Sequence, residues 1–390
     1  MPQQWSEAFG LPVPDAEAVA ISEQLIERII DRINQSDGVI GFDEYMHMAL
    51  YQPGLGYYVA GSAKFGPSGD FVTAPEISSL FGGCLANQLH QLIKQGCAAQ
   101  VLEFGAGSGA LCAQIMQALP SLGCYQILEP SPDLRQRQQA YLRQRLEDDL
   151  FVKVEWLSGL PENFTGVVLA NEVIDAMPVH RVERRLDWVE MGVGFDGDRF
   201  EWRRMNPQAE LREFLVNLES RLGEFSAGYC TEVNLNHAPW MQALADFGDE
   251  LVILIIDYGY EQPDYYRPQR ASGTLICHYR HRVHDDPLIY PGLQDITAFV
   301  DFDALADAGE AAGFATIGLV SQAEFLIANG LSEAAQQRAT EADERTLIHL
   351  TQEIKTLTLP QEMGEKFKVL AMQKGLTLDV PAMRRGVDYG

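Results

Sequence analysis

The sequence predicts an α/β fold built on a mainly parallel sheet. From Val101 onward, short apolar runs alternate with helical stretches, and the run LVILIIDYGY (251–260) is apolar almost throughout. Alternation of strand and helix gives parallel strands, and strands covered by helices on both faces are continuously apolar. The segment VLEFGAGSGAL (101–111) is typical of a strand that enters a glycine turn and then a helix. We therefore expect a doubly covered sheet with a ligand-binding turn.

Two helices are expected ahead of this sheet. Apolar residues recur with helical spacing from about Pro14 to Ser36, and Gly41 to Leu50 predicts a second, shorter helix. The segment from Tyr51 to Glu76 contains too many glycines and prolines for a regular element, so it is expected to form a long ordered loop. Long loops of this kind are often functional, and we expect this one to lie over a ligand.

The elements of the sheet follow in chain order. Strands are expected at 101–104, 125–130, 151–157, 166–172 and 251–257, with helices at 110–119 and 133–146 between the first three strands. The end of the chain predicts a helix at 302–312, a strand at 315–320 and further helices. No internal repeat or low-complexity tract interrupts this order.

An insertion separates the fourth expected strand from the fifth. Residues 187–205 alternate around an Asp-Gly turn and predict a hairpin, and a charged helix is expected at 207–223. Insertions on a shared cofactor-binding core usually select the substrate, although a hairpin without a role is the alternative.

Charge and cysteine usage narrow the class of protein. The chain has 390 residues, and 55 acidic against 29 basic residues give a net charge of −26, which repels nucleic acid and favours basic partners or serves solubility alone. The six cysteines form no C-x-x-C pair, so reduced, packed thiols are expected. The N-terminal segment resembles no targeting signal, and no apolar run reaches the roughly 18 residues of a membrane span. The sequence therefore predicts a cytoplasmic protein without membrane insertion.

The glycine turn after the first strand fits two classes of nucleoside cofactor. Gly105, Gly107 and Ala110 match the dinucleotide pattern G-x-G-x-x-G/A. Glu103 would oppose an anionic pyrophosphate but would favour the ammonium and sulfonium groups of S-adenosylmethionine, so the turn favours the latter cofactor. The cofactor-binding residues expected at this turn are Glu103, Gly105, Ala106, Gly107 and Gly109.

An acidic residue ends the next expected strand. Glu129, followed by Pro130, comes about 24 residues after Gly105, where a carboxylate can accept hydrogen bonds from both ribose hydroxyls. Both classes of cofactor use this position, so Glu129 indicates a nucleoside site without discriminating between them. Two ordinary exposed carboxylates at strand ends are the alternative for Glu103 and Glu129.

Polar residues also follow the fourth and fifth expected strands. Asn171, Glu172, Asp175 and His180 come after one strand and Asp257 ends the other. Because ligands of open α/β sheets bind at the carboxyl ends of the strands, we expect these catalytic candidates to face the cofactor and a cationic acceptor. Glu172 as the cap of a following helix, and His180 as a packed histidine, remain alternatives.

The run HYRHRVH places three histidines at a spacing of three residues. Arg280 and Arg282 lie between His278, His281 and His284 and would repel a divalent cation. We expect no metal site from this run, and none elsewhere in the chain.

Several segments resemble the MidA-like S-adenosylmethionine-dependent methyltransferases, a family that includes a mitochondrial complex I assembly factor that methylates a protein arginine. The resemblance is carried by GDFVTAPEISSLFG, VLEFGAGSG, ILEPSPDLRQRQ, LANEVIDAMPVH, IIDYGY, GTLICHYRH, DITAFVDF and MGEKFKVL, which extend from about Tyr51 to Leu370. It implies a class I (Rossmann-like) methyltransferase core, in which a seven-stranded, mainly parallel sheet with one antiparallel hairpin strand is flanked by helices.

The resemblance also implies a division of the chain. Residues 1–97 would form an N-terminal helical cap and cofactor-covering loop, 98–180 and 250–325 the cofactor-binding core, 181–249 an inserted acceptor-side subdomain, and 326–390 a C-terminal helical segment. In the covering loop, Asp70, Thr73 and Glu76 match residues that close over the methionine end of S-adenosyl-L-methionine, and Glu129 matches the acid that binds ribose.

The resemblance implies methyl transfer to an arginine of a basic protein partner of the respiratory complex I type. Glu172 would hold the guanidinium, with Asp175, Asp257 or Glu232 as the second carboxylate. A cofactor-binding assembly factor without catalysis, a small-molecule methyltransferase and, more distantly, a nicotinamide dehydrogenase are the alternatives. A homodimer is compatible with the sequence, which does not determine the oligomeric state.

Overall fold

A computed structural model describes residues 10–59, 72–340 and 342–384 of the chain. These residues divide into two compact units. The sheet unit consists of residues 72–174, 237–260 and 302–384, and the hairpin unit consists of residues 10–59, 175–236 and 261–301, as far as these are described.

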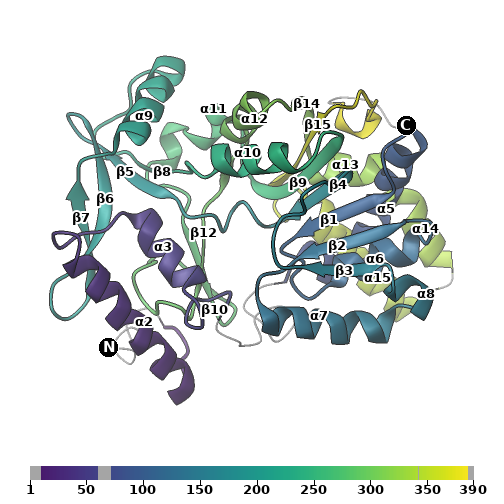
Figure 1. The fold of residues 1–390 in the computed structure, drawn as a ribbon, viewed down its shortest axis with the longest axis horizontal. Coiled ribbons are helices and arrows are strands. Elements are labelled where there is room, and N and C mark those ends of the chain that lie inside the picture. The colour runs from purple at the N-terminus through teal and green to yellow at the C-terminus, as the bar shows by residue number, and fades with distance from the viewer. Residues whose placement is uncertain (1–9, 60–71, 341, 385–390) are drawn as a thin grey trace. The chain divides into compact units, whose positions relative to one another are not determined.

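The sheet unit is built on seven strands in the order β14-β15-β9-β4-β1-β2-β3 (Figure 1). The strands are β1 (Gln100–Phe104), β2 (Cys124–Leu128), β3 (Val154–Leu157), β4 (Gly166–Asn171), β9 (Leu251–Tyr260), β14 (Ala315–Ser321) and β15 (Phe367–Lys374). β15 pairs antiparallel with both β9 and β14, and the remaining pairs are parallel. The predicted α/β fold with a mainly parallel central sheet is confirmed.

The register of the parallel strands brings their carboxyl ends to one edge. Phe104, at the end of β1, pairs with Leu128 of β2 and with Ala170 of β4. Asn171, at the end of β4, pairs with Ile256 of β9. The chain goes from β1 outward to β2 and β3 and then returns to the other side of β1 as β4, so the strand order reverses between β1 and β4. Ligands of open parallel sheets bind at such a reversal.

Helices flank this sheet in Figure 1. They are α4 (Ala74–Ile77), α5 (Ser79–Lys94), α6 (Ala110–Ala118), α7 (Pro132–Arg145), α8 (Asp148–Phe151), α10 (His237–Phe247), α12 (Phe302–Ala311), α13 (Gln322–Ala328), α14 (Leu331–Thr340) and α15 (Glu344–Thr358). α5 packs against α6 and α14, and α12 packs against α10, β9, β14 and β15. Because helices cover the strands, the six residues Leu251 to Ile256 of β9 are almost fully buried.

The hairpin unit combines helices with antiparallel sheets. Its main elements are α2 (Ala16–Asn34), α3 (Phe42–Tyr51), β5 (His180–Arg184), β6 (Trp188–Phe195), β7 (Phe200–Met205), α9 (Ala209–Leu222), β8 (Cys230–Val233), α11 (Gln262–Tyr265), β10 (Ile276–Tyr279), β11 (Arg282–His284), β12 (Asp295–Thr297) and β13 (Val300–Asp301). One sheet has the order β7-β6-β5-β8 and the other β11-β10-β12. The buried faces of α2 and α3 share a hydrophobic core with Val193 and Phe200 of the hairpin.

Most elements expected from the sequence are observed within one or two residues of their expected ends. The helices expected at 14–36 and 41–50 are α2 and α3, the hairpin expected at 187–205 is β6 and β7, and the helix expected at 207–223 is α9. β15 lies in the segment after residue 326, for which the residue pattern indicated only helices. The sequence also placed residues 151–153 in the third strand, whereas Phe151 ends α8 and the strand begins at Val154.

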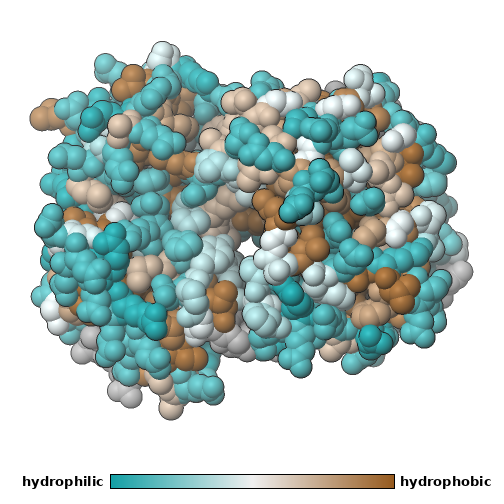
Figure 2. Space-filling view, in the orientation of Figure 1, coloured by the Kyte–Doolittle hydropathy of each residue, from teal (hydrophilic) through white to brown (hydrophobic). Residues whose placement is uncertain are grey.

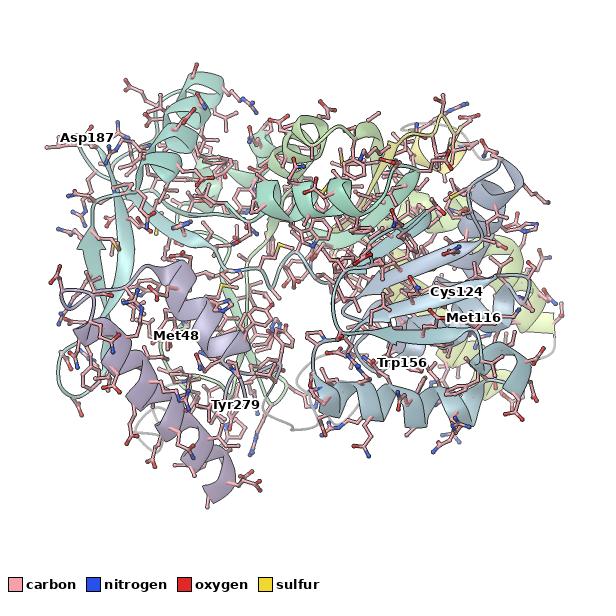
Figure 3. All side chains as sticks on the ribbon, viewed as in Figure 1. Met48, Met116, Cys124, Trp156, Asp187 and Tyr279 are labelled. Atoms are coloured by element: carbon pink, nitrogen blue, oxygen red, sulfur yellow. The ribbon has the colours of Figure 1, made fainter. Side chains whose placement is uncertain are left out.

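The surface of the described residues matches the acidic, polar composition. The face drawn in Figure 2 is mainly hydrophilic, with smaller hydrophobic patches between the polar side chains. All six cysteines carry free thiols, including Cys124, which Figure 3 labels at the start of β2. Among the described helices, none has the length and apolar composition that crossing a bilayer requires.

Candidate functional site

The glycine turn after β1 has a backbone that favours glycine at three positions. Gly105, Gly107 and Gly109 have φ angles of 61°, 54° and 87°, in the left-handed region that side chains disfavour. A Cβ atom at Gly105 would lie 3.2 Å from the Val173 side chain. Gly109 is also the N-cap of α6 and offers no side chain to cap the helix. The turn, which includes Ala106, therefore brings glycine backbone and the N-terminus of α6 to the edge of the sheet. This is the edge at which the strand order reverses.

Glu129 follows β2 at the same edge and is held by two donors. Its Oε1 accepts the N–H of Ser131 at 2.9 Å, and its Oε2 accepts Nε2 of Gln138 at 3.1 Å. Burial raises the pKa of Glu129, and these hydrogen bonds together with Arg135 oppose that rise. Each carboxylate oxygen can accept a further hydrogen bond, so the geometry fits recognition of a ribose diol. Pro130 follows directly and leads into α7.

The amide of Gln138 connects Glu129 with the glycine turn and with β3. Nε2 of Gln138 also donates to the carbonyl of Gly107 at 3.0 Å, and Oε1 of Gln138 accepts Nε1–H of Trp156 at 3.0 Å. Figure 3 shows Trp156 on the side of β3 that faces α7. The sequence analysis did not identify Gln138 or Trp156. α7 contains many polar residues, so the sequence does not distinguish Gln138 from its neighbours. Only the fold shows that Gln138 is buried beneath the turn.

Glu103 lies deeper than its sequence position indicated. Glu103 is 2% exposed to solvent, and its Oε2 accepts a hydrogen bond from the hydroxyl of Tyr125 at 2.8 Å. Burial raises the pKa of Glu103 to about 7, although the hydrogen bond from Tyr125 acts in the opposite direction. The sequence analysis expected this carboxylate near the mouth of the strand, but Glu103 precedes the last residue of β1 and lies between Ile127 and Leu169 of the neighbouring strands.

Glu172 follows β4 with a strained backbone. Its φ angle is 54°, which costs a residue other than glycine about 1–3 kcal/mol and persists only where the surroundings enforce it. The N–H of Glu172 donates to the carbonyl of Ile256 at 2.9 Å, and Nδ2 of Asn171 donates to Oε1 of Glu172 at 3.2 Å. Residues 172–179 form no helix, so the alternative that Glu172 caps a helix does not apply.

Asn171 itself has spare hydrogen-bonding capacity. Its Oδ1 is buried without a hydrogen-bond partner among the described residues. Buried acceptors are rarely left unsatisfied, so an orphaned amide oxygen at this edge favours a bound donor.

Asp257 supports the turn that carries Glu172. The residue is completely buried, and its Oδ2 accepts the N–H groups of Val173 at 3.2 Å and Ile174 at 3.0 Å. Its Oδ1 accepts the N–H of Tyr258 at 2.9 Å. The sequence analysis expected Asp257 to meet an acceptor directly. Three backbone donors instead occupy the carboxylate, which holds the segment after Glu172 in place.

The expected covering loop, 51–76, is described at residues 51–59 and from residue 72. Asp70 lies outside the described residues. Thr73 begins α4, in which its carbonyl accepts the N–H of Glu76 at 2.9 Å. α4 packs against α6, and Nε2 of Gln114 donates to the carbonyl of Pro75 at 2.6 Å. Thr73 and Glu76 therefore lie on a short helix next to the helix that the glycine turn begins.

Asp175 and His180 belong to the hairpin unit. The carbonyl of Asp175 accepts the N–H of Ala298 at 2.9 Å. Nδ1 of His180 lies 2.8 Å from Oε1 of Glu190 and 3.6 Å from Oδ1 of Asp43. Burial alone would lower the pKa of His180, but the hydrogen bond to Glu190 and the charges of Asp43 and Glu190 outweigh it, and the pKa is raised.

The sequence analysis did not identify Asp43 and Glu190 as partners of His180. One available signal was that Glu190 shares a strand face with Trp188, Gly192 and Gly194, so it is the single charged residue on that face of β6. Asp43 carried no such signal, because it is an ordinary acidic residue in the first turn of a helix.

Glu232 is a saturated structural carboxylate. The residue is completely buried, its Oε1 accepts NH1 of Arg181 at 2.6 Å, and its Oε2 accepts the hydroxyl of Thr274 at 2.9 Å as well as the backbone N–H of Thr274. This arrangement differs from the expectation that Glu232 could serve as a second carboxylate for an acceptor.

Comparisons with known proteins give a consistent result. A family model described as "Putative S-adenosyl-L-methionine-dependent methyltransferase" matches residues 81–320. Protein arginine methyltransferase NDUFAF7, mitochondrial, from Mus musculus is 30% identical over 371 residues, which cover 87% of this chain and 82% of that protein. The Danio rerio protein of the same name is 27% identical over 393 residues, with 90% and 87% covered.

A solved structure extends the similarity to three dimensions. A superfamily member from Burkholderia thailandensis, bound to S-adenosyl-homocysteine, is 39% identical and superposes with a TM-score of 0.89 over 96% of this chain and 98% of that chain.

The names of the relatives correct one expectation. The proteins from Mus musculus, Rattus norvegicus and Homo sapiens are named mitochondrial, which contradicts the prediction of a cytoplasmic protein. That prediction depended on the lack of a targeting signal and of a long apolar run, and such absences do not identify a compartment.

Proposed function

Because the chain belongs to a family of S-adenosyl-L-methionine-dependent methyltransferases, we propose that it methylates an arginine side chain of a partner protein. The cofactor is S-adenosyl-L-methionine, which supplies an electrophilic methyl group on a sulfonium. The arginine acceptor is supported by the names of relatives that are about 30% identical. The observation that carries the proposal is the strained Glu172 at the end of β4, adjacent to the strand that leads into the glycine turn.

The residues around the glycine turn fit the cofactor. The turn and the N-terminus of α6 offer backbone N–H groups to a carboxylate, and no Cβ atoms obstruct a close approach at Gly105, Gly107 and Gly109. Glu129 offers both carboxylate oxygens to the ribose hydroxyls while Ser131 and Gln138 hold it in position. α4, with Thr73 and Glu76, is proposed to border the methionine end of the cofactor.

Glu172 is proposed to bind the acceptor guanidinium. A guanidinium is a poor nucleophile because its lone pairs are delocalised and its pKa exceeds about 12. A carboxylate that accepts two of its N–H groups localises the positive charge away from the attacking nitrogen. The new N–C bond forms as the S–C bond breaks, and the proton lost from the attacking nitrogen passes to Glu172. Asn171 orients this carboxylate through its contact with Oε1.

Asp257 is proposed to act as a positioning residue for this step. Methyl transfer is an in-line displacement, so small displacements of the nucleophile cost rate steeply. The hydrogen bonds from Val173 and Ile174 to Asp257 fix the backbone immediately after Glu172. The resemblance implies an acceptor protein of the respiratory complex I type, with residues 181–249 as the acceptor-side subdomain.

The proposal can be tested with isotope-labelled S-adenosyl-L-methionine and a cell extract that lacks this protein. Mass spectrometry of the extract is expected to detect labelled methylarginine after addition of the wild-type protein. Glu172→Gln is expected to bind the cofactor with unchanged affinity in calorimetry and to lose transfer. The matched control is Glu162→Gln, which removes an exposed carboxylate of the same unit and is expected to transfer normally. Normal turnover by Glu172→Gln would refute its role, and label on residues other than arginine would refute the acceptor.

A further inference from the structure

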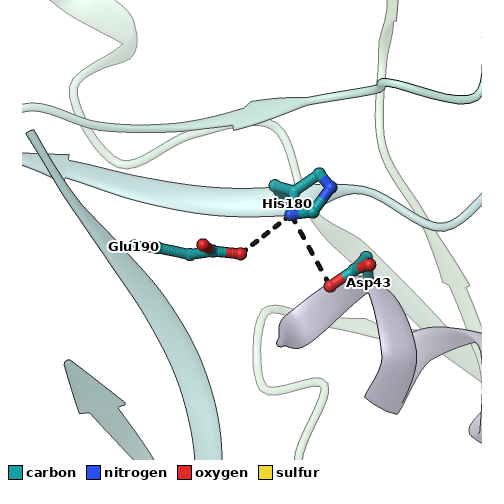
Figure 4. A group of neighbouring side chains, drawn as sticks. All are labelled: Asp43, His180 and Glu190. Carbon is teal, nitrogen blue, oxygen red and sulfur yellow. Dashed lines mark hydrogen bonds and ion pairs between the residues drawn. The ribbon is translucent and has the colours of Figure 1, made fainter. Parts of the chain in front are cut away.

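Three potential metal ligands meet in the hairpin unit. Asp43 comes from the first turn of α3, His180 from the start of β5 and Glu190 from β6 (Figure 4). One ligand atom from each residue lies within 4.8 Å of those of the other two. Asp43 is distant in sequence from the other two, whereas His180 and Glu190 lie on the paired strands β5 and β6, so the packing of α3 completes the group.

The spacing of the three ligand atoms is close to that of a metal site. Nδ1 of His180 lies 2.8 Å from Oε1 of Glu190 and 3.6 Å from Oδ1 of Asp43. Ligand atoms around a tetrahedral ion with bonds of about 2.0–2.1 Å are separated by about 3.3 Å. Small side-chain rotations, without movement of the backbone, would accommodate an ion that replaces the hydrogen bond between His180 and Glu190.

Burial distinguishes this group from an ordinary cluster of surface acids. Glu190 is completely buried, and its second oxygen, Oε2, has no hydrogen-bond partner among the described residues. Figure 4 shows the carboxylate of Glu190 directed at His180. A buried carboxylate with an unsatisfied oxygen is destabilising unless a counter-charge is supplied. A divalent cation between Glu190 and Asp43 would supply that charge.

The backbone next to Asp43 leaves room at the group. A Cβ atom on Gly41 would lie 3.6 Å from Oε1 of Glu190 and in collision with Oδ1 of Asp43. The side chain of Asp43 is 34% exposed, whereas those of His180 and Glu190 are 10% and 1% exposed. An ion would therefore be held from the inside by two residues and reached from solvent on the side of Asp43, where water could complete its coordination.

We propose that Asp43, His180 and Glu190 bind one divalent transition-metal ion of the zinc type. An imidazole together with two carboxylates suits Zn²⁺ and its neighbours, whereas Mg²⁺ and Ca²⁺ prefer oxygen ligands throughout. The ion connects α3 with β5 and β6 and is a structural element of the hairpin unit. The site is independent of the identity of the methyl acceptor.

Calorimetric titration of the chelator-treated, full-length protein with ZnCl₂ tests the proposal, and titration with CoCl₂ followed by visible absorption reports the ligand geometry. We expect binding of one ion per chain. Asp43→Asn and Glu190→Gln, which keep the side-chain shapes, are each expected to weaken binding at least about tenfold. The control is Glu44→Gln, because Glu44 is the next residue on α3, is 35% exposed, and pairs with Arg32. It is expected to bind Zn²⁺ like the wild type.

Thermal unfolding distinguishes a structural site from weak surface binding. ZnCl₂ is expected to raise the melting temperature of the wild type and of Glu44→Gln but not that of Asp43→Asn, because an ion that binds only the folded state stabilises it. A wild-type protein that binds no Zn²⁺, or an affinity equally reduced in Asp43→Asn and Glu44→Gln, would overturn the proposal. If the wild-type protein binds no Zn²⁺, a protonated His180 would supply the positive charge between the two carboxylates.

Discussion

The two groups of polar side chains in this protein are stabilised in different ways. At the edge of the sheet, Asp257 and Glu129 accept hydrogen bonds from backbone N–H groups close to them. In the hairpin unit, Asp43, His180 and Glu190 have mainly one another as partners. Backbone donors hold a carboxylate rigidly and, at Glu129, leave lone pairs for a ligand, whereas mutual pairing of two acids and a histidine concentrates negative charge. The first arrangement suits binding of an organic cofactor, and the second suits binding of a cation.

The largest effect is expected from Asp257→Asn. An amide at this position would turn its NH₂ group towards backbone N–H donors and leave at least one of them buried and unsatisfied, at a cost of about 1–3 kcal/mol. The strained Glu172 backbone would then lose its support, and methyl transfer is expected to fall by about a hundredfold. Steady-state kinetics and urea unfolding measure the two effects.

The opposite outcome is an Asp257→Asn protein that loses stability but keeps a normal turnover number. Asp257 would then be a purely structural residue with no influence on Glu172. Cofactor affinity measured by calorimetry serves as the internal control, because the backbone N–H groups of Val173, Ile174 and Tyr258 that donate to Asp257 lie outside the glycine turn, which should bind as before.

The second prediction concerns the stability contributed by Glu103. Its pKa is about 7 in the folded state against an ordinary value of 4.5. The folded state therefore holds the proton more tightly than the unfolded chain. The contribution of Glu103 to the unfolding free energy should be largest below about pH 4.5, fall by about 3 kcal/mol as the pH rises to about 7, and then level off. Glu103→Gln, which still accepts the Tyr125 hydroxyl, is expected to lack this decline.

Urea unfolding midpoints between pH 4.5 and 8 measure this difference. Glu162→Gln is the matched control, because Glu162 is exposed, and its curve should parallel that of the wild type. Equal slopes for wild type and Glu103→Gln would contradict the burial of an ionisable group in β1. A cofactor with a cationic amino-acid moiety should reduce the wild-type decline by favouring the ionised form of Glu103.

The sheet edge could be predicted from the sequence to a large degree, and the hairpin group could not. Parallel strands align their carboxyl ends, so residues that follow 104, 128, 171 and 256 were expected at one edge before any register was known. The sequence could not predict which hydrogen-bond donors each carboxylate accepts. Glu103 and Asp257 appear in the sequence as similar strand-end acids, yet one is bonded to Tyr125 and the other to backbone donors.

The group around His180 depends on contacts across more than 100 residues of chain. Asp43 and His180 meet because α3 packs against β5 and β6, and a single sequence carries no pattern for such a pairing. The position of β15 is a similar case. Its strand pattern is weak, and its place beside β9 is decided by long-range pairing. Local patterns thus predict edges and turns, while the partners of buried charges depend on the tertiary fold.

A smaller effect is expected from Gly105→Ala. Alanine at a φ of 61° costs about 1–2 kcal/mol, and its Cβ would lie 3.2 Å from Val173. Cofactor affinity is expected to fall about tenfold in calorimetry if the turn opens to relieve the strain. Gly83→Ala is the control, since Gly83 lies in α5 with open space at its Cβ position, and this substitution should leave affinity unchanged. Equal affinities for all three proteins would show that the turn does not approach the cofactor closely.

The smallest effect is expected from Trp156→Phe. This substitution tests whether a residue that does not contact Glu129 directly helps to hold it in position for its ligand. The substitution removes the donor to Oε1 of Gln138 and keeps most of the aromatic packing against Phe151. Gln138 would then orient Glu129 less firmly, and the affinity for S-adenosyl-L-methionine is expected to fall a few fold, corresponding to less than about 1 kcal/mol. Affinity for a ribose-free fragment such as methionine should not change, because Glu129 serves only the nucleoside. A parallel loss for both ligands would mean that Trp156 acts on the whole turn through Gly107 and not on the ribose acid alone.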